Sequence, residues 1–355
     1  MPRNLIICPT FDHAETLLFA ISSVQAQTMR DWELKVILDG SPDRSIEIVE
    51  AFATRDSRIS FDAHPKGDGY GERYRDAAIK ASDAERIFHL GDDDLWAPEH
   101  MAHMSRGLDK GDWALTGVLF IGENRQASWH AGHLGCPPLR AKAAKGSMGH
   151  SGLNNVAVRR AAYDQLDVGW EPAKPSSEVN MWRKYLARND VRAACSARAT
   201  VFKFAAAHRD KRSSLQRAAE LSSFATSIGT PEARDAFRVA ASFGRGLCFQ
   251  LYHSGAAQAG SFEEAMALAH LSLDRSAAEW ATDGEAMALR LWPKQRAFLE
   301  LIWQMLRALE TGDSAALEAL HRARTDDPVG TARLAEAVCV YTGRQKTDAG
   351  ALLAM

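Results

Sequence analysis

Residues 87–98 read Ile87-Phe88-His89-Leu90-Gly91-Asp92-Asp93-Asp94-Leu95-Trp96-Ala97-Pro98, an apolar run that ends in three consecutive aspartates and a turn. Three adjacent carboxylates repel one another, so the acidic run by itself does not stabilise the protein. A divalent cation would reverse that balance, because hard cations take oxygen ligands. The run therefore indicates either a metal site or a solvated acidic turn, and the neighbouring sequence has to decide between them.

Short apolar segments alternate with amphipathic ones through the first part of the chain. Strand-like segments occur at 4–8, 34–38, 59–61 and 86–90, and helical periodicity lies between them. This alternation predicts βαβ units and a mostly parallel sheet. Ligands of such sheets bind beyond the carboxyl ends of the strands. Phe11, Asp39 and the three aspartates each follow a predicted strand, so we expect them to line one crevice.

The last part of the chain has a different composition. After an extended segment at 192–204 comes a charged and polar stretch at 208–214. The remainder is rich in Ala, Leu, Glu and Arg and poor in β-branched residues, which favours helices. We therefore predict an α/β domain over residues 1–210 and an all-α domain over residues 211–355.

Composition limits the kind of protein this is. The 355 residues make two domains the default expectation. A formal net charge of -2 gives no argument for a nucleic-acid partner. No apolar run approaches the ~18 residues of a transmembrane segment, and the N-terminus lacks the pattern of a signal peptide. The 5 scattered cysteines, with no CxxC pair, argue against a zinc cluster and predict a reducing, cytoplasmic location.

Several motifs, in order, resemble those of the family 2 glycosyltransferases, which have the GT-A fold. The resemblance covers about the first 210 residues. The matching segments are Cys-Pro-Thr-Phe-Asp at 8–12, the first helix at 20–28, Trp-Glu-Leu-Lys-Val-Ile-Leu-Asp-Gly-Ser at 32–41, Arg-Asp-Ala-Ala-Ile at 75–79, the aspartate run at 90–98, and the helix at 178–186.

The resemblance implies a GT-A, Rossmann-like sheet, mostly parallel and flanked by helices, followed by the all-α domain. It implies an inverting, Mn²⁺- or Mg²⁺-dependent transfer of a sugar from a nucleoside diphosphate, with UDP favoured, to a hydroxyl acceptor. The acceptor would be a saccharide, a lipid-linked molecule or a protein in cell-surface polysaccharide or glycoconjugate synthesis. The enzyme would be cytoplasmic or peripheral at the inner face of the membrane. The resemblance does not cover the C-terminal helices, which could dimerise the enzyme, dock a partner in polysaccharide assembly or bind a protein acceptor.

The resemblance also implies roles for individual residues. The expected metal ligands are Asp93, Asp94 and His208. The expected donor-binding residues are Pro9, Phe11, Asp39, Asp76 and Asp92. The expected general base is Glu178, and Glu171 is the second candidate. Each residue also has a plainer alternative role. The aspartate run could be a solvated acidic turn, His208 a surface histidine in a linker, and Phe11 a core aromatic. Asp39 could cap a helix, Asp76 could form an ion pair on a helix face, and Glu178 could be a glutamate in the first turn of a helix.

This sequence departs from the family pattern at three positions. Gly91 stands where the family's first aspartate is expected, so the metal ligand is predicted to be Asp93. Leu38 replaces the first aspartate of the second strand's motif, which leaves Asp39 to recognise the base. Val179 follows Glu178 in place of an acidic residue, so the catalytic base depends on one carboxylate.

Two other classes of function stay open at this point. The reduced acidic motif at Glu178 is compatible with a non-catalytic sugar-nucleotide-binding or scaffold protein. A sugar nucleotidyltransferase would need a basic, glycine-rich signature after the first strand. That position reads Pro9-Thr10-Phe11-Asp12-His13, so this alternative is the weaker one.

Overall fold

The computed structural model describes residues 3–122, 127–130, 140, 144, 152–174, 176–204, 212–242, 251–252, 255–269, 285–342, 344–345 and 347–354. The chain forms two compact units. The first comprises Met1–Arg125 and Gly132–Gly229, and the second comprises Gln126–Ala131 and Thr230–Met355. The division therefore falls later than the predicted residue 210. Helix α9 (Ser214–Ser227) belongs to the first unit because it packs against α1 (Ala14–Gln25).

The first unit is built on a mixed sheet with the strand order β3-β2-β1-β4-β8-β6-β9-β5. Its strands are β1 (Asn4–Thr10), β2 (Glu33–Asp39), β3 (Ile59–His64), β4 (Arg86–His89), β5 (Leu95–Trp96), β6 (Trp113–Ile121), β8 (Val156–Arg159) and β9 (Ala193–Phe204). β3, β2, β1 and β4 are mutually parallel, whereas β8 is antiparallel to both of its neighbours. The predicted α/β class is confirmed, and the parallel half of the sheet brings the carboxyl ends of its four strands to one edge.

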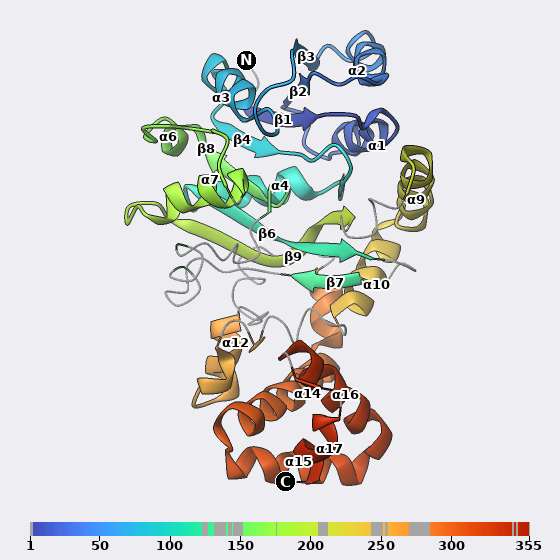
Figure 1. Ribbon diagram of the computed structural model, residues 1–355, viewed down its shortest axis with the longest axis vertical. Coiled ribbons are helices and arrows are strands. Elements are labelled where there is room, and N and C mark those ends of the chain that lie inside the picture. Colours follow the sequence, from blue (N-terminus) through green and yellow to red (C-terminus); the bar gives the residue numbers. More distant parts are fainter. Residues whose placement is uncertain are drawn as a thin grey trace. The chain divides into compact units, whose positions relative to one another are not determined.

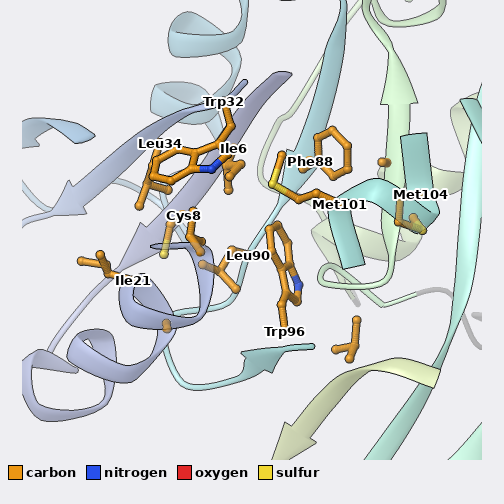
Figure 2. Close-up of a cluster of buried hydrophobic side chains, with 14 of the residues drawn as sticks. Ile6, Cys8, Ile21, Trp32, Leu34, Phe88, Leu90, Trp96, Met101 and Met104 are labelled. Atoms are coloured by element: carbon orange, nitrogen blue, oxygen red, sulfur yellow. The ribbon is translucent and has the colours of Figure 1, made fainter. Parts of the chain in front are cut away.

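Helices cover both faces of this sheet (Figure 1). Besides α1 and α9 they are α2 (Ser45–Ala53), α3 (Glu72–Ala81), α4 (His100–Leu108), α6 (Arg160–Tyr163) and α7 (Ser177–Leu186). Successive β1 side chains point to opposite faces, as strand geometry requires. Leu5 and Ile7 join the core under α3, α6 and α7. Ile6 and Cys8 join the core under α1, α2 and α4, part of which Figure 2 shows.

The core under α7 contains a cluster of aromatic rings around a buried histidine. His89 ends β4, and its ring centroid lies 5.3 Å from that of Trp170 and 5.8 Å from that of Trp182, both edge-on. Burial of the ring is the main cause that lowers the pKa of His89 to about 3. His89 is therefore neutral and packs as an aromatic residue directly before the acidic run.

Strand β1 continues to Thr10, two residues beyond its predicted end at Cys8. The β1–β4 ladder stops at the pair Ile7 and His89, whereas the β1–β2 ladder extends to Thr10. Pro9 lacks a backbone N–H, but it lies where β1 has no β4 partner. The strand therefore extends through the proline, which then contributes to the wall above the sheet.

The second unit is helical, as predicted. It contains α10 (Pro231–Ser242), η2 (Ala256–Gln258), α12 (Phe262–Ala269), α14 (Glu285–Thr311), α15 (Ser314–Asp326), α16 (Pro328–Tyr341) and α17 (Asp348–Ala354), together with the short β7 (Ala127–His130). Gly312, at φ 65°, ends α14, and Asp313 Oδ1 accepts the Ala316 N–H at 2.8 Å to start α15. Within the described ranges, none of the helices combines the length and the apolar character that a membrane span requires.

Candidate functional site

A pocket of about 640 Å³ opens at the carboxyl ends of β1, β2 and β4. Its walls come from these strand ends, from the glycine-rich loop before α3, and from the start of α7. The predicted site residues that line it are Pro9, Phe11, Asp39, Asp92, Asp93, Asp94 and Glu178. Residues spread over the first 178 positions thus share one cavity. Its volume lies in the usual range for small-molecule sites.

Asp39, at the end of β2, forms one end of the pocket. Its side chain is buried, Oδ1 accepts the Gly67 N–H at 2.8 Å, and Oδ2 accepts from Lys66 Nζ at 2.5 Å. The same ammonium lies 5.1 Å from the centroid of the Phe11 ring. Gly40, at φ 72°, permits this approach, because a Cβ there would come within 2.4 Å of the Lys66 backbone nitrogen. Lys66, which the sequence did not single out, is therefore part of this end of the pocket.

The structure places Asp76 outside the lining of this pocket. Its carboxylate accepts from Tyr163 Oη at 2.6 Å and from Lys80 Nζ at 2.7 Å. The preceding residue, Arg75, lines the pocket instead. Arg75 is buried, stacks over the Trp170 ring at 4.1 Å, and donates to a backbone carbonyl. Burial lowers the pKa of Arg75, opposed by nearby carboxylates, yet a guanidinium stays charged.

The three consecutive aspartates have different surroundings. Asp92 Oδ2 lies 2.9 Å from His13 Nδ1, and Asp93 Oδ2 accepts from Arg217 at 2.9 Å. Asp94 is fully buried and accepts the Phe204 N–H at 2.8 Å. It also accepts from Lys203 Nζ at 3.1 Å and from the Asn154 amide. Asp94 therefore ties the loop to β9, whereas Asp92 and Asp93 lie together with His13.

His13, Asp92 and Asp93 form a set that fits a metal ion. One ligand atom from each lies within 4.8 Å of the others. Asp12 adopts a left-handed backbone conformation, φ 57°, which an aspartate tolerates better than most residues. This turn lets Phe11 and His13 face the same pocket from either side of Asp12. Two carboxylates and an imidazole form a donor set that suits a divalent cation.

Gly91 departs from the family pattern because Asn154 lies beside it. The Asn154 Oδ1 accepts the Gly91 N–H, and its amide nitrogen donates to Asp94. The backbone carbonyl of Asn154 accepts the Trp96 indole N–H at 3.1 Å. Asn154 is buried and lines the pocket. It therefore holds the turn between β4 and β5 at three points.

Glu178 enters the pocket from the first turn of α7. Ser176 begins this helix by accepting the Val179 N–H, and Glu178 is half-buried. Within the part of the chain that the structure describes, no group hydrogen-bonds to the Glu178 carboxylate. The nearby charge is positive, on Arg75 and Lys203. Asp94 is the main cause that raises the pKa of Lys203, so this lysine stays charged.

His208 lies outside the described residues, so its predicted role as a ligand stays a prediction. Sequence reasoning missed His13, Lys66, Asn154, Lys203 and Arg217. Lys203 is the one charged residue in the otherwise apolar segment Val201–Phe204, and a charge in such a segment indicates a functional or paired side chain. A basic residue in the glycine-rich loop after β3 is a weaker signal for Lys66. The sequence contains no comparable signal for Arg217.

The fold and pocket together define an α/β domain of the GT-A type, in which the ends of parallel strands carry an aromatic residue, a buried carboxylate and an acidic cluster. Residues 5–167, a little under half of the chain, match the family model described as glycosyl transferase family 2. The recognition made from the sequence motifs is thereby confirmed.

Curated relatives match over parts of their lengths. The chain is 36% identical over 97 residues to "Poly(ribitol-phosphate) beta-N-acetylglucosaminyltransferase TarP" of Staphylococcus aureus (strain N315), covering 27% of this chain and 29% of that protein. It is 35% identical over 120 residues to "Uncharacterized glycosyltransferase EpsJ" of Bacillus subtilis (strain 168), covering 34% of each. The chain thus spans about a third of the length of these relatives.

Solved structures match over most of the chain but at low identity. S. aureus TarS 1-349 in complex with UDP-GlcNAc has a TM-score of 0.45 and 14% identity, covering 99% of this chain and 88% of that chain. The mannosyltransferase PcManGT from Pyrobaculum calidifontis, in complex with GDP-Man and Mn2+, has a TM-score of 0.40 and 16% identity. Its match covers 87% of this chain and 88% of that one.

Proposed function

We propose that this protein is a metal-dependent, inverting glycosyltransferase that moves a sugar from a nucleoside-diphosphate sugar to a hydroxyl acceptor. The observation that carries the proposal is that Phe11 and Asp39, the acidic pair Asp92 and Asp93, and Glu178 line one pocket. These groups are what a nucleotide base, a diphosphate and an acceptor hydroxyl each require. The match of residues 5–167 to the family model supports the same reaction class.

The base and ribose of the donor bind at the Asp39 end. Phe11 is 42% exposed and offers a ring face to a planar base. The Asp39 carboxylate accepts from an imide N–H. The adjacent Lys66 ammonium, which also donates to the backbone carbonyls of Gly67 and Gly69, exchanges one of these carbonyls for a carbonyl oxygen of the base. Uracil has an N–H flanked by two carbonyl groups, so UDP is the favoured nucleotide.

Asp92, Asp93 and His13 would hold the divalent cation, and when bound it would neutralise the departing diphosphate as a Lewis acid. Carboxylate ligands suit Mg²⁺ and Mn²⁺ alike, but Mg²⁺ prefers oxygen donors, so the imidazole of His13 favours Mn²⁺. Asp94 keeps the acidic turn in place through its bonds to β9 and Asn154. We therefore assign Asp94 a positioning role in place of the ligand role expected from the sequence.

Glu178 acts as the general base. As the acceptor oxygen bonds to the anomeric carbon, its proton passes to the Glu178 carboxylate and the bond between that carbon and the diphosphate oxygen breaks on the opposite face. The result is inversion at the anomeric carbon. A carboxylate with no hydrogen-bond partner among the described residues is available to receive this proton. Lys203 adds positive charge to the same pocket.

A role in cell-surface polysaccharide synthesis is the biological setting we propose. TarP is named as a poly(ribitol-phosphate) N-acetylglucosaminyltransferase, and ExoW of Rhizobium meliloti (strain 1021), 27% identical over 114 residues, is named a succinoglycan biosynthesis protein. One name refers to poly(ribitol-phosphate) and the other to succinoglycan, and both support a polymer or glycan product. The acceptor is accordingly proposed to be a saccharide or a polymer hydroxyl group.

A donor-hydrolysis assay tests the proposal. The purified chain is incubated with Mn²⁺ and a panel of UDP-, GDP- and dTDP-sugars, and release of the nucleoside diphosphate is measured. We expect turnover of a UDP-sugar that stops with EDTA and returns with Mn²⁺. Asp93→Ala should lose the metal-dependent turnover. Binding of UDP-sugars without any turnover would favour the scaffold alternative, and turnover unaffected by EDTA and by Asp93→Ala would refute the role of the metal.

A further inference from the structure

Arg217, on α9, lies directly against the acidic pair. Its Nη2 donates to Asp93 Oδ2 at 2.9 Å, and its Nη1 lies 3.2 Å from His13 Nε2. A guanidinium offers only donors, so His13 Nε2 accepts from Arg217, and a cation that took this lone pair would have to displace the guanidinium. The other ring nitrogen, Nδ1, lies 2.9 Å from Asp92 Oδ2. Arg217 thus bonds to two members of the metal-binding set, Asp93 and His13.

The position of Arg217 is fixed by its helix. Ser213 and Gln216 form a reciprocal capping box at the start of α9, and Arg217 is the next residue. α9 packs along α1, which begins immediately after His13. The Arg217 side chain is only 13% exposed. Its Nε–H is buried and has no acceptor among the residues that the structure describes. This arginine is therefore held against the acidic pair from outside the pocket lining.

A fixed positive charge beside two carboxylates changes what the site will bind. A divalent cation that enters between His13, Asp92 and Asp93 is attracted by the carboxylates but repelled by Arg217. A diphosphate reverses this effect, because its negative charge attracts the cation and the guanidinium together. Arginine also binds phosphate through paired N–H donors, so a diphosphate that reached the guanidinium would be held as well as attracted.

We infer that Arg217 makes metal binding conditional on the donor, so that the cation and the nucleoside diphosphate bind tightly only together. This inference rests on the proposed function, since it requires a divalent cation and a diphosphate in this pocket. It goes further in assigning a residue from α9, outside the recognised motifs, as the source of the coupling. By linkage, the factor by which UDP tightens Mn²⁺ binding equals the factor by which Mn²⁺ tightens UDP binding.

The coupling factor can be measured directly. Mn²⁺ binding to the full chain is titrated by electron paramagnetic resonance, with and without saturating UDP. In Arg217→Gln, we expect Mn²⁺ alone to bind about tenfold more tightly than in the wild type, because the repelling charge is gone. The ratio of the two Mn²⁺ dissociation constants should fall by about tenfold. Arg217→Lys keeps the charge and should keep most of the ratio.

Arg212→Gln is the matched control. Arg212 lies just before α9 and pairs with Glu220 at 3.0 Å, so its loss removes a charge without touching the acidic pair. Its ratio should equal that of the wild type. Arg217→Met serves as a second neutral variant, and thermal unfolding identifies the variants that are folded. If the ratio of the two Mn²⁺ dissociation constants is unchanged in a folded neutral variant, the inference is overturned and the metal-dependent function still stands. Absence of Mn²⁺ binding to wild-type protein at saturating UDP instead overturns the metal-dependent function, and the inference with it.

Discussion

The side chain of Asn154 occupies the space beside Gly91. Its Oδ1 accepts the Gly91 N–H, and a Cβ added at residue 91 would approach that oxygen to within 2.9 Å. Real Cβ contacts of this length are essentially never seen, and Asn154 is also tied to Asp94. The glycine and the asparagine therefore depend on each other, and together they shape the acidic turn.

A double-mutant cycle should reveal this dependence. Gly91→Ala should lower the free energy of unfolding by about 1–3 kcal/mol, because the methyl group meets the Asn154 amide. In the Asn154→Ala background the same substitution should cost less, since the obstructing amide is absent. Urea unfolding of the four proteins gives the coupling energy. Additive effects would mean that the two residues do not depend on each other.

Glu178→Gln tests the proposed general base. Glutamine keeps the size of the side chain but cannot take the acceptor proton, so kcat should fall by about 10²-fold or more. The affinity for UDP and Mn²⁺ should stay within about threefold of the wild type, as measured by titration calorimetry. A variant with wild-type kcat would show that another group accepts the proton.

Glu171→Gln is the control for that variant. Glu171 lies seven positions earlier, outside the pocket lining, and its carboxylate accepts from Lys184 at 2.6 Å. The hydrogen bond from Lys184 is the main cause that lowers the pKa of Glu171. Its substitution should leave kcat unchanged. A loss of kcat in this variant, with Glu178→Gln active, would move the base assignment to Glu171.

Much of this site could be predicted because it depends on local order along the chain. Phe11, Asp39 and Asp92 each follow a strand, and parallel strands bring their carboxyl ends to the same edge. Arg75 and Asp76 show the limit of that reasoning. Neighbouring residues on a helix point about 100° apart, and the family motif, which implies that both face the crevice, did not decide that Arg75 rather than Asp76 lines the pocket.

The residues that were missed depend on tertiary packing. Arg217 reaches Asp93 across 124 positions, because α9 returns to pack on α1. Lys66 reaches Asp39 only because Gly40 leaves room for the loop after β3. His13 faces the pocket only because Asp12 adopts a left-handed conformation. No periodicity or spacing in the sequence encodes these three arrangements.

Lys66→Met tests the base-binding end of the pocket. The variant leaves the buried Asp39 carboxylate with the Gly67 N–H but without its charged partner, and it removes a donor to the base. UDP affinity should fall by about tenfold, and the free energy of unfolding should fall by about 1–3 kcal/mol. Lys35→Met is the control, since Lys35 pairs with Asp62 at 3.2 Å away from the pocket lining. Equal UDP affinity in both variants would exclude Lys66 from donor binding.

Buried histidines should make the first unit sensitive to acid. Burial is the main cause that lowers the pKa of both His89 and His100 to about 3, against an ordinary value of 6.5. Below pH 6.5 the unfolded chain takes up protons that the folded protein excludes, so stability falls as the pH falls from 6.5 towards 3. Each histidine contributes about 1.4 kcal/mol per pH unit across this window.

His89→Phe isolates one of these contributions. A phenyl ring suits the space between Trp170 and Trp182, where neither ring nitrogen of His89 has a partner among the described residues. The free energy of unfolding, measured by urea titration at several pH values, should then fall less steeply between pH 6 and pH 4, by about 1.4 kcal/mol per pH unit. His321→Phe, at an exposed position, should keep the wild-type slope. Equal slopes in all three proteins would show that His89 is protonated in the folded state.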